Sequence, residues 1–446
     1  MDSSLTTRSS VVRVYMVLAG LYTLAASLIW GVNTLFLLDA GLSISQVFVV
    51  NAIFSAGMVV FEIPTGVVAD TLGRRMSYLL SVVVLGATTV LYLVIAETSG
   101  SAVAFAIVSA FMGLGFTFYS GALDAWLVDA LGHVGDADGL DHVFARSQQV
   151  TGVAMLVGTT AGGFLGQLDL AIPFVVRAVL LVGLLSVAFR LMVEVGFEPK
   201  ELHLAEVPSA MREQAATGIQ YGWGRPGLRA LMLSGVARAS FFGWAFYASQ
   251  PYFLELLDRD AIWVVGVITA LMSLSTIAGN QLVEVLSRRC RRRSTLLLWG
   301  AGVSSAASVA MGVTSSFWVA VPCFLLVTGS MGVMMPVRQA YMHNEIPSDH
   351  RATVISFDAM VSSVGGVGGQ LSLGRLADAR SLSAGYVVGG AFTALALPAL
   401  ARMRRVGGSS DIIPGTDVVE GSCAAHGLPR DIQHESQPVA VGAAGD

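Results

Sequence analysis

The sequence predicts an all-α integral membrane protein in which twelve transmembrane helices form two pseudo-symmetric six-helix bundles. Three observations support this prediction. Of the 446 residues, 54% are hydrophobic and only 13% are charged, whereas soluble domains contain about 25% charged residues. The mean hydropathy is +0.70. The apolar residues fall into twelve long stretches, and one long polar connection divides these into six and six.

Each apolar stretch is long enough for a helix to cross about 30 Å of hydrocarbon, which requires roughly 20 residues. The stretches are continuous, whereas the strands of a membrane barrel show alternating segments of about ten residues. The first stretch has no small-residue cleavage site at signal-peptide length, so we expect a retained span. The predicted spans are 14–37, 44–69, 78–96, 102–128, 147–166, 171–189, 230–254, 261–284, 295–313, 317–341, 353–374 and 384–401.

The polar segments define the domain organisation. The amino-terminal bundle covers residues 14–189 and the carboxy-terminal bundle covers residues 230–401, with a linker over residues 190–229. A short segment, residues 1–13, precedes them. The tail, residues 402–446, contains scattered Gly and Pro without apolar periodicity, and we expect it to be disordered.

The distribution of positive charge predicts the topology. Of the 26 Lys and Arg residues, 20 lie in the segments on the side of the two termini, and only three lie in the connections on the other side. Because cytoplasmic loops of membrane proteins carry the excess of positive charge, both termini are expected in the cytoplasm. We therefore expect a multi-pass protein of the cell (plasma) membrane.

Common enzymatic motifs are absent from the sequence. It has no Gly-x-x-x-x-Gly-Lys-Ser/Thr loop, no His-Glu-x-x-His and no Gly-x-Ser-x-Gly. The three cysteines show no paired spacing, and all seven histidines lie outside the predicted spans. We expect a protein that is not an enzyme and that has no metal, no cofactor and no nucleic-acid partner. Its surroundings are the lipid bilayer, in which we expect it to function as a monomer.

The two halves contain an internal repeat at an offset of 214 residues. Residues 66–75 align with residues 280–289, which places acid on acid and an arginine pair on an arginine pair, in each case after the second span of a half. The matched residues are Asp70 with Glu284, Arg74 with Arg288, and Arg75 with Arg289. Such duplication is typical of secondary transporters.

The loop after the second span resembles the signature loop of the major facilitator superfamily through Gly66, Asp70, Gly73, Arg74 and Arg75. The resemblance covers about 400 residues through topology, loop lengths and the degenerate second copy. It implies two bundles that rock about a central cavity lined by spans 1, 4, 7 and 10. The alternative is that the arginines only fix the topology, which leaves the glycine and aspartate spacing unexplained.

This loop is predicted to form a gate on the cytoplasmic side. The glycines allow a tight turn and close packing of the loop, and Asp70 with the arginine pair can lock the gate through charge-assisted hydrogen bonds. Asp129 lies about one and a half helical turns nearer the cytoplasm than Asp124, within reach of Arg74, and we assign it as the gate partner.

The fifth span resembles the antiporter motif of the same superfamily. Gly152 and Gly158 match it, but Thr159 stands where the family has a proline. Tight packing of small residues explains the glycines, and we favour that interpretation.

Carboxylates are the only proton carriers that the predicted spans offer, because no histidine lies at membrane depth. Glu62 lies roughly 12 Å deeper than Asp70 on one helix and is a proton-coupling candidate. A neutral acid that stabilises an interface is the alternative. Asp124 and Asp358 are further candidates, although the start of a helix favours a carboxylate such as Asp358 without any transport role.

Three arginines lie within the spans. Arg338 is the repeat mate of Asp124, so we predict an ion pair between them across the two bundles, with a static strut as the alternative. Arg238 either faces the cavity, where it favours anionic substrates, or snorkels toward the cytoplasm, which we favour. Arg177 is predicted to snorkel toward the outer surface.

Aromatic residues cluster on the spans that the resemblance assigns to the cavity. Such residues suit flat apolar molecules and cations, although interfacial belts explain many of them equally well. The cavity candidates are Tyr22, Trp30, Tyr119, Trp126, Phe242 and Trp244, together with Arg338 and Arg238.

The resemblance implies a secondary transporter that moves a small molecule by alternating access. We expect proton-coupled efflux of an amphipathic organic compound, such as a drug or secondary metabolite. The alternatives are a proton-coupled nutrient importer and a transporter-like receptor that binds without translocating.

Overall fold

The computed structural model describes residues 7–98, 100–135, 140–199, 209, 212 and 216–413. Each of the twelve predicted spans coincides with one helix or with a pair of consecutive helices, and no strand occurs among the described residues. Nine of these helices or pairs are long and apolar enough to cross a membrane. The predicted fold class is confirmed.

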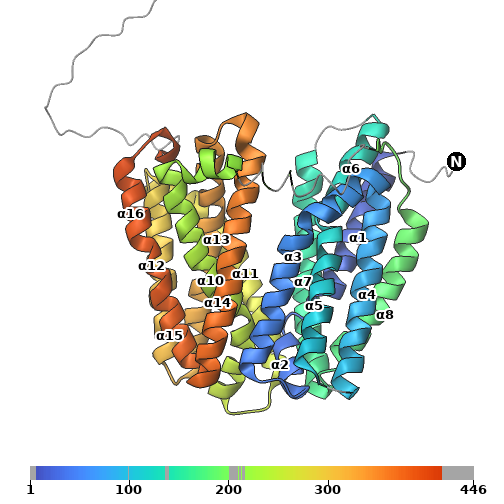
Figure 1. Cartoon of the computed structure of the whole chain (residues 1–446), viewed down its shortest axis with the longest axis horizontal. Helices are drawn as coiled ribbons and strands as arrows, with labels where there is room; N and C mark the ends of the chain where they lie inside the picture. Colours follow the sequence, from blue (N-terminus) through green and yellow to red (C-terminus); the bar gives the residue numbers. More distant parts are fainter. Residues whose placement is uncertain are drawn as a thin grey trace, which may run out of the picture.

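The amino-terminal bundle contains the helices of the first six spans and lies on the right of Figure 1. They are α1 (Arg8–Ser27) with α2 (Asn33–Asp39), α3 (Ile44–Leu72), α4 (Arg74–Thr98), α5 (Ala102–Tyr119) with α6 (Ala122–His133), α7 (Leu140–Leu168) and α8 (Ile172–Leu191). The carboxy-terminal bundle contains α10 (Pro226–Leu257), α11 (Ile262–Arg289), α12 (Arg293–Val313), α13 (Phe317–Glu345), α14 (Arg351–Ala379) and α15 (Leu382–Thr393) with α16 (Ala396–Val406).

Several helices continue beyond the predicted apolar stretches. α7 begins at Leu140 and α10 at Pro226, because backbone hydrogen bonding continues into polar segments that hydropathy does not detect. The fourth span is broken between α5 and α6 at Gly121, whose φ of +72° lies in the left-handed region that favours glycine.

The beginning of the tail is ordered, which corrects the predicted disorder for residues 402–413. α16 ends at Val406, and a short 3-10 turn, η4 (Ser409–Asp411), follows it. The Asp411 carboxylate accepts hydrogen bonds from the backbone N and Oγ of Ser294, at 2.7 and 2.8 Å. These bonds satisfy the start of α12, so the segment is fixed by a helix cap that apolar periodicity does not reveal. Residues 414–446 lie outside the described residues.

Each bundle has its own apolar core, and apolar side chains also pack between the bundles, where Phe48 of α3 joins the second core and Val32 and Leu35 contact Ile262 and Val265. The bundles meet mainly where α3 packs on α14 and α7 packs on α11. One face of the molecule carries Arg74 and Arg75 of the first half and Arg288 and Arg289 of the second. We call it the arginine-rich face and the other the opposite face. In Figure 1 the bundle ends lie apart at the top, near α6, and come together at the bottom, near α2.

Candidate functional site

Two adjoining hollows lie between the bundles. The wide hollow, of about 500 Å³, is lined by α3, α10 and α14. The deep hollow, of about 330 Å³, lies farther toward the opposite face and also reaches α8 and α11. Met58 and Phe242 border both hollows, which therefore form one continuous central cavity.

Hydrogen bonds and close helix contacts join the bundles on the opposite face. Ser45 Oγ donates to Asp378 at 2.9 Å, and the backbone N of Thr34 donates to the side chain of Gln250 at 2.8 Å. α7 and α11 meet at two glycines, because a Cβ atom on Gly163 would lie 2.7 Å from the Cα atom of Gly266. This end of the cavity is closed.

The arginine-rich face differs from the opposite face in the contacts between the bundles. Between described residues, no hydrogen bond or ion pair joins the two bundles at that face. The wide hollow lies on the side of the deep hollow that is nearer to this face, as the order of its lining residues along α3 and α10 shows. The described conformation is therefore closed at the opposite face and separated at the arginine-rich face.

Glu62 lines the wide hollow from α3, and its side chain is exposed there. Its carboxylate accepts a hydrogen bond from Ser120 Oγ at 3.2 Å. Arg238 of α10 borders the same hollow from the other bundle. The favoured prediction that Arg238 snorkels to the surface is wrong, because tertiary packing directs α10 with this residue toward the interior.

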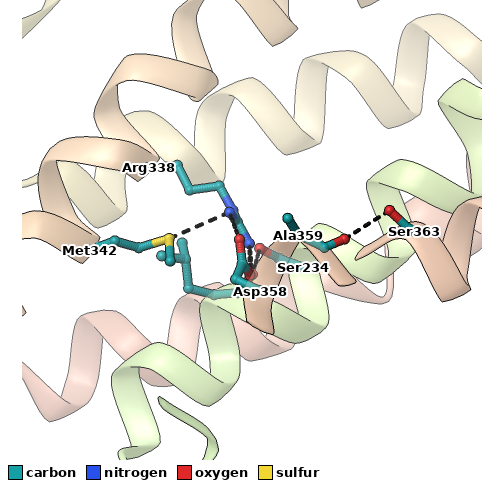
Figure 2. Close-up of polar contacts among 7 residues, drawn as sticks. Ser234, Arg338, Met342, Asp358, Ala359 and Ser363 are labelled. Atoms are coloured by element: carbon teal, nitrogen blue, oxygen red, sulfur yellow. Dashed lines mark hydrogen bonds and ion pairs between the residues drawn. The ribbon is translucent and has the colours of Figure 1, made fainter. Parts of the chain in front are cut away.

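Arg338 and Asp358 form a buried ion pair inside the carboxy-terminal bundle. The two guanidinium nitrogens Nη1 and Nη2 donate to the two carboxylate oxygens, each at 2.6 Å. Figure 2 shows the guanidinium directed from α13 at the carboxylate of α14. Asp358 lies seven residues after the start of α14 at Arg351, so it does not stabilise the helix start, which corrects that prediction.

The predicted ion pair between Asp124 and Arg338 is not present. The Asp124 carboxylate accepts a 2.6 Å hydrogen bond from the Tyr15 hydroxyl of α1, and Ser147 of α7 donates to the same hydroxyl at 3.3 Å. All three residues belong to the amino-terminal bundle. Repeat mates occupy equivalent places in separate bundles, and here each finds its partner within its own bundle.

The loop between α3 and α4 has the predicted charges. Arg74 contacts Asp70 at 2.5 Å, and its Nε atom lies 3.7 Å from Asp129 Oδ2, within the reach that helical spacing predicted. The second copy repeats the first contact, because Arg288 pairs with Glu284 at 2.5 Å with both side chains exposed. Gly66 faces open space, so the close packing expected of it is not realised in this conformation.

Glu194, after α8, contacts this loop, and the sequence analysis missed it. Its carboxylate accepts a 2.8 Å hydrogen bond from the backbone N of Arg75 at the start of α4. Burial raises the pKa of the Glu194 carboxyl, while the hydrogen bond from Arg75 opposes that rise. Gly73 has a φ of +105°, and a Cβ atom there would lie 2.5 Å from the Glu194 carboxylate. Only glycine suits this turn.

The aromatic candidates divide into two groups. Trp30 and Phe242 line the cavity as predicted. The other four correct the prediction, because they pack into apolar cores. Tyr22 stacks on Tyr119 at 3.6 Å, and Trp126 donates to the Val193 carbonyl at 2.8 Å. Trp244 packs against Tyr386 of its own bundle and against Phe48 of α3 in the other bundle.

The glycines of α7 support the packing interpretation of the partial antiporter motif. A Cβ atom on Gly158 would collide with Ser27, and one on Gly162 would collide with the backbone of Leu28. These glycines let α7 approach α1 closely.

Arg177 of α8 is the clearest departure from expectation. Its side chain is 1% exposed and borders the deep hollow, so the predicted snorkelling to the outer surface is wrong. The packing of α8 against α1 and α4 turns this side chain inward.

Two pseudo-equivalent helical bundles around a cavity that is closed at one face define a membrane transporter. The family profile of the Major Facilitator Superfamily matches residues 15–370 and 261–434. The chain belongs to the Major Facilitator Superfamily. It is therefore a membrane transporter for a small molecule and not an enzyme.

Curated relatives include a resistance protein and an efflux pump. The chain is 24% identical to the class C tetracycline resistance protein of Escherichia coli over 358 residues, which covers 76% of this chain and 82% of that protein. It is 26% identical to the multidrug efflux pump Tap of Mycolicibacterium fortuitum over 362 residues, which covers 77% and 82%, respectively.

Solved structures of similar fold include the nucleoside transporter NupG, with a TM-score of 0.73 at 10% identity, covering 89% of this chain and 99% of that one. A bacterial homologue of the human lysosomal transporter Spinster, in an inward-facing and occupied conformation, gives a TM-score of 0.68 at 13% identity, covering 92% and 99%. At these identities the likeness shows the fold alone.

Proposed function

We propose that this transporter exports an amphipathic organic compound from the cytoplasm across the plasma membrane in exchange for protons, as a monomer. The observation that carries the proposal is the exposed carboxylate of Glu62 in a cavity between the two bundles. The two curated relatives, a tetracycline resistance protein and a multidrug efflux pump, support export of a drug-like molecule.

The distribution of arginines supports the orientation. The excess of positive charge on the arginine-rich face favours a cytoplasmic location for that face and for both termini. The described conformation then presents its cavity toward the cytoplasm. A compound that enters there is released outside once the contacts at the opposite face break and the arginine-rich face closes.

Glu62 couples this cycle to protons in the proposal. The ionised carboxylate accepts a hydrogen bond from Ser120 while the cavity faces the cytoplasm. When the cavity faces the acidic exterior, the carboxylate takes up a proton, and the neutral form allows the empty transporter to return because an uncharged carboxyl group is less costly to remove from water as the cavity closes around it. Downhill proton entry thereby drives export.

The loop formed by Asp70, Gly73, Arg74 and Arg75 serves as the cytoplasmic gate in the proposal, with Asp129 as its partner. In the described conformation Arg74 is held by two carboxylates of its own bundle. Closure of the arginine-rich face brings this loop toward the second bundle, where charge-assisted bonds hold the gate until they break on opening.

Inverted membrane vesicles test the direction and the coupling together. Tetracycline serves as the first probe, because a curated relative is a tetracycline resistance protein. Under a pH gradient that is acidic inside, the proposal predicts accumulation of the probe inside the vesicles and its loss when a protonophore collapses the gradient. Movement out of the vesicles with the protons indicates a nutrient-type importer, and binding without movement for a panel of amphipathic probes indicates a receptor. Either outcome overturns the proposal.

A further inference from the structure

We infer that the deep hollow contains a subsite for an acidic oxygen group of the substrate, with the Arg177 guanidinium as its ligand. The inference rests on the proposed transport function and narrows its substrate class to amphipathic compounds that carry a carboxylate or another anionic oxygen, including zwitterions.

The inference begins with the isolation of Arg177. The residue lies on α8, five residues after its first residue, Ile172, and its side chain is 1% exposed. Among the described residues, none of its nitrogens Nε, Nη1 and Nη2 has a hydrogen-bond acceptor. It is thus a fully buried guanidinium that borders a cavity and has no partner.

Such an arrangement is energetically unfavourable in the empty protein. Arginine keeps its charge in proteins, so it cannot relieve burial by losing a proton. Burial of an unpaired charge is strongly unfavourable, and a charge at membrane depth requires a partner, water or a functional role. The nearby phenols of Tyr22 and Tyr92 are neutral groups. An anion that enters the hollow supplies the missing acceptor.

The charges of the whole cavity agree with this assignment. Among the described residues, Arg177 is the only charged one that lines the deep hollow, and the wide hollow adds Glu62 and Arg238. The charged side chains that line the two hollows are thus one carboxylate and two guanidinium groups. The cavity retains a net positive charge even with Glu62 ionised, and this favours an anionic or zwitterionic occupant over a simple cation.

A second donor borders the same hollow. Asn51 accepts a hydrogen bond from Asn33 at 3.2 Å, which leaves its own buried Nδ2 atom without an acceptor. Aromatic rings, among them Trp30, Phe116 and Tyr247, form much of the remaining wall. A volume of about 330 Å³ is within the range for small organic ligands. The wall therefore suits an aromatic body that carries its anionic group toward Arg177.

Two matched probes test the charge preference by equilibrium binding to the purified full chain in detergent at neutral pH. 2-Naphthoate carries a carboxylate, and 2-naphthamide has the same ring and nearly the same size without charge. We expect the wild-type protein to bind naphthoate at least tenfold more tightly than naphthamide. Arg177→Met should abolish this preference and leave the affinity for naphthamide within about twofold of wild type. Retained naphthamide binding also shows that the variant is folded.

Two further variants sharpen the test. Arg177→Lys keeps the charge and should retain part of the preference for naphthoate. Arg190→Met removes a positive charge from the exposed end of the same helix and should leave the wild-type ratio unchanged. The inference is overturned if the wild type binds both probes equally, or if Arg177→Met weakens both probes to the same extent, as a purely structural role requires.

The binding assay is independent of the proposed export. A naphthoate preference that depends on Arg177 supports the subsite even if no pH gradient drives transport, and in that case only the proposed proton-coupled export fails. Proton-driven export of tetracycline by a protein that does not distinguish naphthoate from naphthamide overturns the subsite and leaves the proposed function intact.

Discussion

Arg338 of α13 and Asp358 of α14 form a two-point ion pair at 2.6 Å within the carboxy-terminal bundle, and both side chains are buried. Arg238, which lines the wide hollow, lies within electrostatic range of this pair. The pair therefore joins α13 to α14 and also acts electrostatically on an arginine in the wall of the cavity.

Removal of either partner of this pair should destabilise the protein strongly. Arg338→Met or Asp358→Asn leaves the other group buried without its partner, at a cost of about 3–5 kcal/mol in the free energy of unfolding. The double variant Arg338→Met with Asp358→Leu should recover most of that loss, because it removes both buried charges. Thermal unfolding of the purified protein in detergent measures the effect, and a double variant no more stable than the single variants contradicts it.

The ion pair also predicts which exchange of charges between two residues should restore stability. Arg338→Asp combined with Asp358→Arg should restore more stability than Arg338→Asp combined with Asp124→Arg, because only the first combination keeps opposite charges within contact. Thermal unfolding of the two double variants decides between them. Equal recovery by both combinations is incompatible with the observed pairing.

Glu62→Gln should abolish pH-driven transport while substrate binding is preserved. The amide keeps the size of the carboxyl group and cannot gain or lose a proton, so the coupling step is removed from an otherwise intact cavity. Flux in inverted vesicles and binding in detergent separate the two effects. Asp141→Asn, at the exposed start of α7, is the matched control and should transport as the wild type does. Unaltered coupling in Glu62→Gln eliminates this residue from the mechanism.

Gly73→Ala should lower the free energy of unfolding by about 1–3 kcal/mol, because the φ of +105° is strained for any residue with a Cβ atom. The added methyl group also displaces the Glu194 carboxylate from the start of α4. Gly66→Ala is the control, because a Cβ atom there meets nothing within 4 Å. Thermal unfolding of both variants should show a loss for Gly73→Ala alone, and equal stability of the two would contradict the assigned turn.

Gly266→Val should disfavour closure of the opposite face. A Cβ atom on Gly266 would lie 2.7 Å from the Cα atom of Gly163, so α7 and α11 could not approach as closely as they do. Spin labels attached to the two bundles at this face should report longer distances than in the wild type. Gly302→Val, on α12 with open space around it, should leave these distances unchanged. Unchanged distances in Gly266→Val would show that the glycine contact does not hold the closed face.

The features that sequence analysis predicted correctly depend on contacts between residues close in sequence or on composition summed over a whole span. The apolar stretches fix the helices, because each span must satisfy its own backbone hydrogen bonds in lipid. The contact between Asp70 and Arg74 is local as well, since the two residues lie only four apart in sequence, on either side of the turn at Gly73. The approach of Asp129 to Arg74 was predicted from helical spacing within the fourth span.

Contacts between residues far apart in the sequence could not be predicted from the sequence alone. The repeat placed Asp124 and Arg338 in equivalent positions, but it contains no information on which neighbouring helix supplies Tyr15 to one and Asp358 to the other. Glu194 was missed for the same reason, because it accepts a hydrogen bond from the backbone amide of Arg75, which lies 119 residues away in the sequence.

The sequence by itself therefore determined the membrane environment, the two bundles and the charge contacts of the loop after the second span. Only the tertiary structure decided that Trp30, Phe242 and Arg177 face the cavity while Trp126 and Trp244 are buried in apolar cores. The physical reason is the uniform apolarity of membrane helices. Residues that face lipid and residues that face a bundle core are both apolar, so the pattern along a span does not reveal its rotation about its own axis. That rotation is fixed by packing against neighbouring helices, and it selects the side chains that a substrate meets.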